Sequence, residues 1–100
     1  MAIIDITVIP VGTATPSVSA YVAEIHQFLQ KYEGPIKYQL TPMSTLIEGD
    51  LKELLEIVQH IHELPFQKGA QRVCTNIRID ERRDKEHSME KKLKSVQAKL

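Results

Sequence analysis

Pro42 separates two short extended segments, and this break constrains the fold more than any other feature of the sequence. The first segment is residues 36–41, and a ladder strand cannot continue through Pro42 because proline has no backbone N–H to donate. Residues 45–47, Thr-Leu-Ile, then predict a second short strand, since β-branched side chains favour strands. Two strands this close in sequence indicate a hairpin, and the rest of the chain is organised around it.

The second of these strands is predicted to end at residues 48–50, where a helix begins. Gly49 can adopt backbone angles forbidden to other residues. Asp50 is expected to cap the helix, and Glu53 follows three residues later, which is the spacing of a capping box. Hydroxyl, carboxylate and glycine groups therefore gather where a strand meets a helix, a common place for ligand sites in α/β proteins. The alternative is a strand end and a well-capped helix with no ligand.

Two longer β-branched runs, residues 2–11 and 72–80, predict the first and last strands. The first is expected to be central, with one apolar face and one mixed face. Asp5 lies on the mixed face. We expect it to pair with Arg72 or Arg78 on a neighbouring strand, with a ligand contact as the alternative.

Two amphipathic helices flank the hairpin, as the spacing of three and four residues between apolar side chains indicates. The first helix carries Val18, Val22, Ile25, Leu29 and Tyr32, and the second carries Leu51, Leu54, Leu55, Val58 and Ile61. Thr15 is the expected N-cap of the first helix, with Pro16 at its first position. Pro65 is expected to end the second helix, and His26 is expected on a solvated side.

A mixed-charge linker, residues 81–86, precedes a third helical pattern. Its apolar stripe consists of Met89, Leu93, Val96 and Leu100. A stripe this narrow is the width of a seam between helices or between a helix and a sheet. We expect it to pack either on its own sheet or on a neighbouring subunit.

The predicted order is strand, helix, strand, strand, helix, strand, with one further helix. This βαββαβ order predicts an α+β fold, the ferredoxin-like sandwich with a four-stranded antiparallel sheet, as one domain over residues 1–100. Right-handed crossovers place both main helices on one sheet face. The other face carries Ile3 and Ile9, and we expect an oligomer to cover it.

The composition argues against several partners. With 13 basic and 13 acidic residues, the chain has no electrostatic footprint for nucleic acid or an anionic membrane. The lone Cys74 allows neither an internal disulfide nor a zinc cluster, and His60 and His62, two residues apart on a helix, cannot share a metal ion. We expect no metal and no cofactor. Without an apolar leader or span, a cytoplasmic location is expected.

Three segments resemble the small thiamine-binding proteins related to YkoF. They are residues 43–50, residues 10–13 with Ser17, and residues 78–85, and the resemblance extends from Ile4 to Val96. It implies a ferredoxin-like domain that assembles as dimers and then tetramers. It also implies binding of thiamine, or of its hydroxymethyl-pyrimidine part, without catalysis.

Five residues are predicted to bind such a ligand. Glu48 can accept a hydrogen bond from the exocyclic amine of the pyrimidine, and the hydroxyls of Ser44, Thr45 and Thr13 can donate or accept. Gly12 and Thr13 form a possible lip. No catalytic residues are predicted, because the candidate loops hold no histidine and no nucleophile–base pair. A small enzyme on the same fold and an assembly module without a ligand remain the alternatives.

Overall fold

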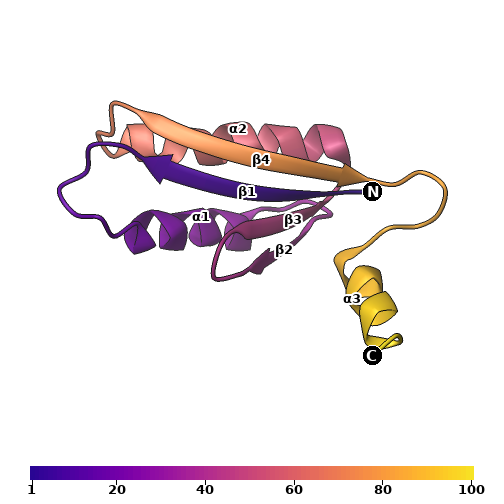
Figure 1. The fold of residues 1–100 in the computed structure, drawn as a ribbon. Helices are drawn as coiled ribbons and strands as arrows, with labels where there is room; N and C mark the ends of the chain where they lie inside the picture. Colours follow the sequence, from indigo (N-terminus) through magenta and orange to yellow (C-terminus); the bar gives the residue numbers. More distant parts are fainter.

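Four strands and three helices alternate along residues 1–100 of the computed structural model (Figure 1). In chain order they are β1 (Ala2–Pro10), α1 (Ser19–Lys31), β2 (Lys37–Leu40), β3 (Thr45–Gly49), α2 (Leu51–Gln67), β4 (Val73–Glu81) and α3 (Met89–Gln97). This order confirms the predicted ferredoxin-like sandwich with an additional C-terminal helix. None of the helices combines the length and the apolar character needed to cross a membrane.

The sheet is antiparallel throughout, with the strand order β2-β3-β1-β4. β1 is central, as predicted, and pairs with β4 along its whole length from Ala2 to Pro10. Its pairing with β3 is shorter, since the last pair joins Ile6 to Thr45. The second half of β1 therefore has a strand partner on only one side.

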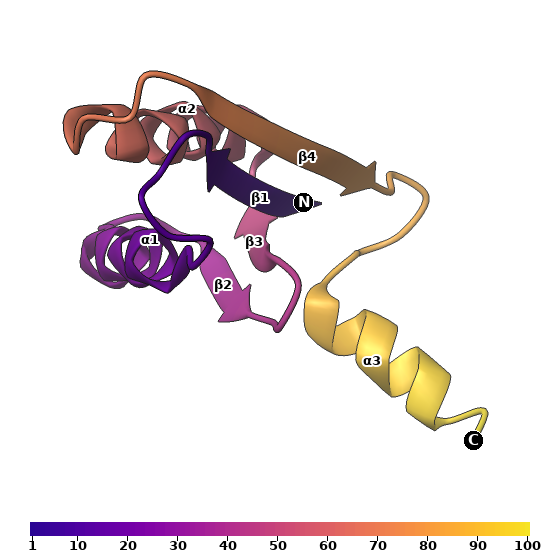
Figure 2. The same cartoon turned by 60° about the vertical axis from the view of Figure 1, so that its left-hand side comes forward.

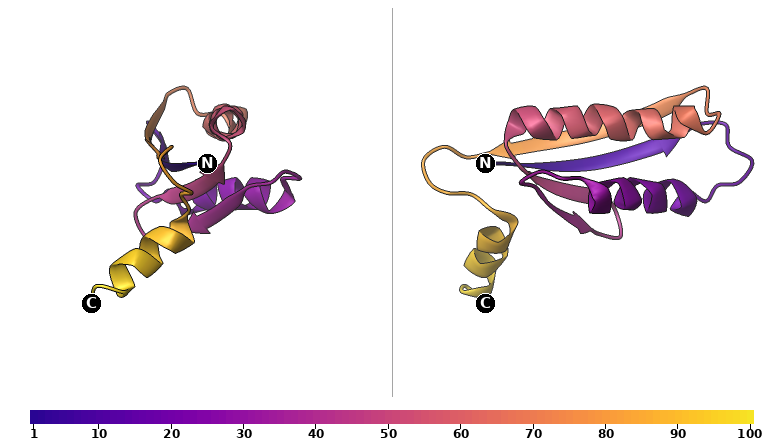
Figure 3. Two further views of the ribbon diagram at one scale, coloured as in Figure 1. Left: turned by 90° about the vertical axis from the view of Figure 1, so that its right-hand side faces the viewer. Right: turned by 180° about the vertical axis from the view of Figure 1, so that it is seen from behind.

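The core lies between the sheet and the two helices that cover one of its faces (Figure 3). Alternate residues of β1 point to this face because side chains along a strand alternate between the two faces. The buried core residues are Ala2, Ile4, Ile6 and Val8 of β1, Ile47 of β3, Ile25 and Leu29 of α1, and Leu54, Ile57, Ile61 and Leu64 of α2. The intervening β1 residues lie on the open face.

Two predicted helix boundaries are wrong. The first helix begins at Ser19, with Val18 as its N-cap, and not at Pro16. Thr15 is held in the preceding loop, where its hydroxyl accepts a hydrogen bond from the Ser17 N–H at 3.3 Å. The second helix continues through Pro65, whose side chain is fully buried, and ends at Gln67. Because proline has no N–H, Pro65 removes one helical hydrogen bond, that to the Ile61 carbonyl, near the end of the helix.

The N-cap of α2 is Asp50, as predicted, but the capping box does not form. The Asp50 side chain makes no capping hydrogen bond. The Glu53 carboxylate instead accepts a hydrogen bond from the Tyr32 hydroxyl at 2.5 Å. This contact joins α2 to the C-terminal end of α1.

α3 stands clear of the sandwich on the side of the open sheet face (Figures 2 and 3). Two side-chain hydrogen bonds hold its first turn in place. The Ser88 hydroxyl caps it by accepting from the Lys91 N–H, and the buried Glu48 carboxylate accepts from the Met89 N–H at 2.6 Å. Beyond that turn, Leu93 is 56% exposed and Val96 is 58% exposed. The apolar stripe of this helix is therefore uncovered within one chain.

Candidate functional site

A cavity of about 780 Å³ lies between the second half of β1, the first half of α1 and the β2–β3 turn. We call it the α1 cavity. Val8, Val22 and Met43 contribute to its mostly apolar wall, and Thr45 and His26 contribute polar groups. Its volume falls within the range of about 300–1,000 Å³ that is typical of small-molecule sites.

A hydrogen bond of 3.1 Å joins His26 Nε2 to Thr45 Oγ1 at this cavity. Thr45 is only 5% exposed, and His26 is half-buried, so the expectation that His26 is solvated is wrong. Burial lowers the pKa of the His26 imidazole below its usual 6.5, because it penalises the charged form. The ring is therefore neutral at neutral pH and places no positive charge at the cavity.

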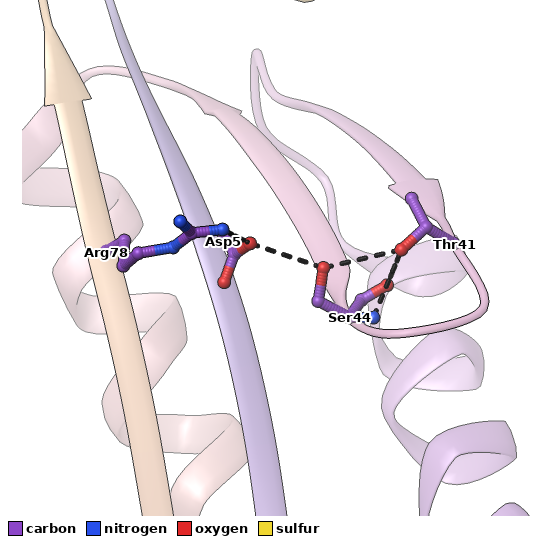
Figure 4. Close-up of polar contacts among 4 residues, drawn as sticks. All are labelled: Asp5, Thr41, Ser44 and Arg78. Atoms are coloured by element: carbon purple, nitrogen blue, oxygen red, sulfur yellow. Dashed lines mark hydrogen bonds and ion pairs between the residues drawn. The ribbon is translucent and has the colours of Figure 1, made fainter.

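A polar chain crosses three strands on the open face and reaches the cavity rim (Figure 4). Arg78 Nη2 donates to Asp5 Oδ2 at 2.8 Å, and Ser44 Oγ donates to the same oxygen at 3.4 Å. This confirms the predicted pairing of Asp5 with Arg78. Thr41 Oγ1 in turn donates to the Ser44 carbonyl at 2.8 Å and accepts from its N–H at 3.1 Å. These contacts fix the β2–β3 turn and the position of Ser44.

A second hollow, of about 600 Å³, lies on the open sheet face beside α3. We call it the α3 groove. Asp5 and Arg78 line its floor, together with the apolar Leu46, and Lys92 and Leu93 of α3 form its wall. Lys92 Nζ pairs with Asp80 Oδ2 at 2.5 Å, and this hydrogen bond lowers the pKa of the Asp80 carboxyl. The groove is thus both charged and apolar.

The five predicted ligand residues lie in three places. Ser44 and Thr45 both line the α1 cavity. Glu48 lies three residues from Thr45 on β3, and because strand side chains alternate it points to the opposite, open face. There its carboxylate accepts a hydrogen bond from the Met89 N–H.

Gly12 and Thr13 lie in the loop between β1 and α1, and neither lines the α1 cavity nor contacts Glu48. Gly12 is exposed, with φ +83°, and the Thr13 hydroxyl donates to the Thr15 carbonyl at 2.7 Å. Glu48 is opposite Ile3, and β1 runs seven residues further to Pro10, about 23 Å at roughly 3.3 Å per residue. The loop and Glu48 therefore lie at opposite ends of β1.

The family model described as "Thiamine-binding protein" matches residues 4–97 of this chain. The chain belongs to the thiamine-binding protein family. This confirms the resemblance found in the sequence. Relatives include a UPF0045 protein encoded beside glkA in Staphylococcus xylosus, 65% identical, and UPF0045 protein YqgV of Bacillus subtilis, 62% identical. The alignments cover all of this chain and 95% and 98% of those proteins, respectively.

Solved structures of similar proteins share the fold of this member of the thiamine-binding protein family. Hypothetical protein MJ1052 of Methanocaldococcus jannaschii superposes with a TM-score of 0.84 at 34% identity, over 96% of this chain and 95% of that one. A Thermotoga maritima protein provisionally named for thiamine biosynthesis or salvage superposes with a TM-score of 0.76 at 18% identity, over 95% and 97%. At that identity the second likeness shows the fold alone.

Sequence patterns did not predict two features of this thiamine-binding family member. His26 follows Val22 by four residues and precedes Leu29 by three, so helical spacing could have placed it on the inner face. The α3 groove had no such signal, because it depends on where α3 lies relative to the open sheet face. Chain order alone does not determine that position.

Proposed function

We propose that this protein binds thiamine or its hydroxymethyl-pyrimidine part without converting it, as a cytoplasmic homo-oligomer, most simply a tetramer of two dimers. The observation that carries the proposal is the match of residues 4–97 to the thiamine-binding protein family. The structure adds a cavity of suitable size and chemistry.

The α1 cavity suits this ligand in three respects. Its apolar walls can pack against an aromatic ring. The hydroxyls of Ser44 and Thr45 can donate to ring nitrogens or accept from the exocyclic amine. The neutral His26 does not repel the permanent positive charge of the thiazolium. With about 18 non-hydrogen atoms at roughly 0.3–0.4 kcal/mol each, thiamine would bind at about micromolar to 0.1 mM.

It stays a prediction that the ligand contacts Gly12, Thr13 and Glu48. A ligand confined to the α1 cavity would bind Thr13→Ala and Glu48→Gln as it binds the wild type. A ligand that also reaches Glu48 would lose a charged hydrogen bond in Glu48→Gln, about 1–3 kcal/mol of binding free energy. Calorimetry on these two variants decides between the two arrangements.

His26 and Thr45 are the pair that comes closest to a catalytic arrangement. A nucleophile beside a base normally has a third group that orients the base. Here no carboxylate hydrogen-bonds to the His26 ring, whose Nε2 is joined only to the Thr45 hydroxyl. This arrangement supports binding without catalysis over the enzyme alternative.

The proposed assembly is supported by uncovered apolar side chains on two elements. On the open sheet face and the strand end beyond it, Ile9 is 46% exposed and Val11 is 43% exposed. On α3, Leu93 and Val96 are more exposed still. Exposed apolar side chains on both the sheet and α3 are the surfaces that we propose the subunits cover on one another.

A thermal-shift screen tests the proposed ligand. The wild-type protein is heated with thiamine, its phosphates, hydroxymethyl-pyrimidine or unrelated metabolites. A ligand at 100 times its Kd should stabilise the protein by about 2.7 kcal/mol. Selective stabilisation by the thiamine group of compounds, recovered unchanged by mass spectrometry, is the expected result. No shift with any of them, or conversion of the ligand, would overturn the proposal.

A further inference from the structure

One residue of β1 at the α1 cavity has backbone N–H and C=O groups that face no partner strand. The Val11 N–H donates to the Arg72 carbonyl at 2.8 Å, which extends the β1–β4 register by one pair. In an antiparallel ladder, alternate residues direct their N–H and C=O groups to opposite neighbours. Odd-numbered residues of β1 therefore bond to β4. Val8, an even-numbered residue, directs its N–H and C=O groups to the other side.

On that side Val8 has no strand neighbour, because β3 begins only at Thr45, which pairs with Ile6. Continued register would place Met43 opposite Val8, but the chain turns there, and the Thr41 N–H closes the hairpin on the Ser44 carbonyl at 2.9 Å. Met43 is 85% exposed and makes no backbone hydrogen bond to Val8. Val8 itself is only 6% exposed and lines the α1 cavity. Backbone donors and acceptors that have no partner in the protein bond instead to water or to a ligand.

From this geometry we infer that the N–H and C=O groups of Val8 bind the aminopyrimidine edge of the ligand; the inference rests on the proposed function. That edge presents a ring nitrogen, which accepts, beside an exocyclic amine, which donates. The N–H of Val8 donates to the ring nitrogen, and its C=O accepts from the amine. The heterocycle thus takes the position opposite Val8 that a further paired residue of β3 would otherwise occupy.

The free edge fits a small planar heterocycle better than an added β-strand. The next residue of β1 that faces the same side is Pro10, which has no N–H to donate. A strand added to this edge would therefore find no N–H donor at Pro10, the next paired position after Val8. Val8 offers one donor and one acceptor, which is what an aminopyrimidine requires.

Amide hydrogen exchange and NMR on the 100-residue chain test this directly. Without ligand, the Val8 amide should exchange faster than those of Ile4 and Ile6, which pair with β3. On adding hydroxymethyl-pyrimidine, the Val8 amide resonance should shift and its exchange should slow. The same pyrimidine without its exocyclic amine should bind about tenfold more weakly, because the Val8 carbonyl then stays unpaired.

A matched pair of variants on α1 provides the second readout. Ala23 and Ala20 are both exposed, but only Ala23 lines the α1 cavity. Ala23→Phe should weaken hydroxymethyl-pyrimidine binding by at least about tenfold, and Ala20→Phe should stay within about twofold of the wild type.

The outcomes separate this inference from the proposed function. If the pyrimidine binds but leaves the Val8 amide unchanged, or binds Ala23→Phe as it binds the wild type, the Val8 site is wrong and thiamine binding stands. If the wild-type protein binds neither thiamine nor the pyrimidine, the proposed function fails, and the Val8 site fails with it.

Discussion

At the scale of single residues, Asp5 of the central strand β1 contacts the edge strand β4 and the residue that precedes β3. One of its carboxylate oxygens accepts from Arg78 on β4 and from Ser44 at the start of β3. Asp5 is mostly shielded, whereas the Arg78 side chain is 84% exposed. The carboxylate therefore depends on its partners more than the guanidinium does, since a shielded charge without partners is costly.

A double-mutant cycle on this pair tests that dependence. Arg78→Ala should lower the free energy of unfolding more than Asp5→Ala, because it leaves the shielded Asp5 carboxylate without its charged partner, whereas Asp5→Ala leaves only an exposed guanidinium. The double variant should lose less than the sum of the two single losses. Urea denaturation of the four proteins gives the values, and simple additivity would show that the two side chains do not interact.

His26 should make the stability depend on pH in a defined direction. Its pKa is lowered in the folded protein, so between that value and 6.5 the unfolded chain binds more protons. The stabilisation is complete above pH 6.5 and is lost as the pH falls through 6.5 toward the lowered pKa. His26→Gln should therefore lose less stability than the wild type between about pH 7.5 and about pH 5.5. If the free energies of unfolding of the wild type and His26→Gln changed equally with pH over this range, the prediction would be contradicted.

At the scale of elements, α3 is held at its N-terminal half, by the hydrogen bond of its first turn to Glu48 and by the ion pair of Lys92 with Asp80. The buried Glu48 carboxylate accepts from the Met89 N–H at 2.6 Å, while the side chains beyond the first turn are exposed. Glu48→Ala should cost about 1–3 kcal/mol of α3 docking, because a charged hydrogen bond is lost and an N–H is left without its acceptor. Amide exchange across Met89–Gln97 should speed up while the core strands keep their protection.

Glu48→Gln is the matched control, because its side-chain oxygen can still accept from Met89. It should retain most of the protection of α3. Equal acceleration in both variants would mean that the negative charge, and not the hydrogen bond, holds the helix. Unchanged exchange in both variants would mean that α3 is held elsewhere.

The elements themselves follow from local sequence patterns, but the site does not. The alternation in residues 2–11 and the spacing of apolar residues in the two main helices lead directly to the β1, α1 and α2 that form. Alternation on β3 could also have separated Thr45 from Glu48, which are three residues apart. The free edge at Val8 had no local signal, because it depends on the offset at which β3 pairs with β1. That offset is set by the tertiary pairing of the two strands.

At the scale of the whole molecule, the open sheet face and the exposed stripe on α3 predict self-association. The chain mass is 11.4 kDa, and light scattering at micromolar concentration should give a multiple of it. Leu93→Asp places a charge in the stripe and should lower the mass or the solubility, because a buried charge without a partner is unfavourable. A monomeric wild type would contradict the assembly, and an unchanged mass in Leu93→Asp would remove α3 from the interface.

Calorimetric titration of the wild-type protein tests thiamine binding most directly. Thiamine and hydroxymethyl-pyrimidine are titrated separately at concentrations up to about 1 mM, which is above the affinity range expected for a ligand of this size. The account predicts saturable heat with at least one of them, at a Kd between about 1 μM and about 0.1 mM. No heat with any thiamine derivative at that concentration would contradict it, and Glu48 would then serve only to hold α3.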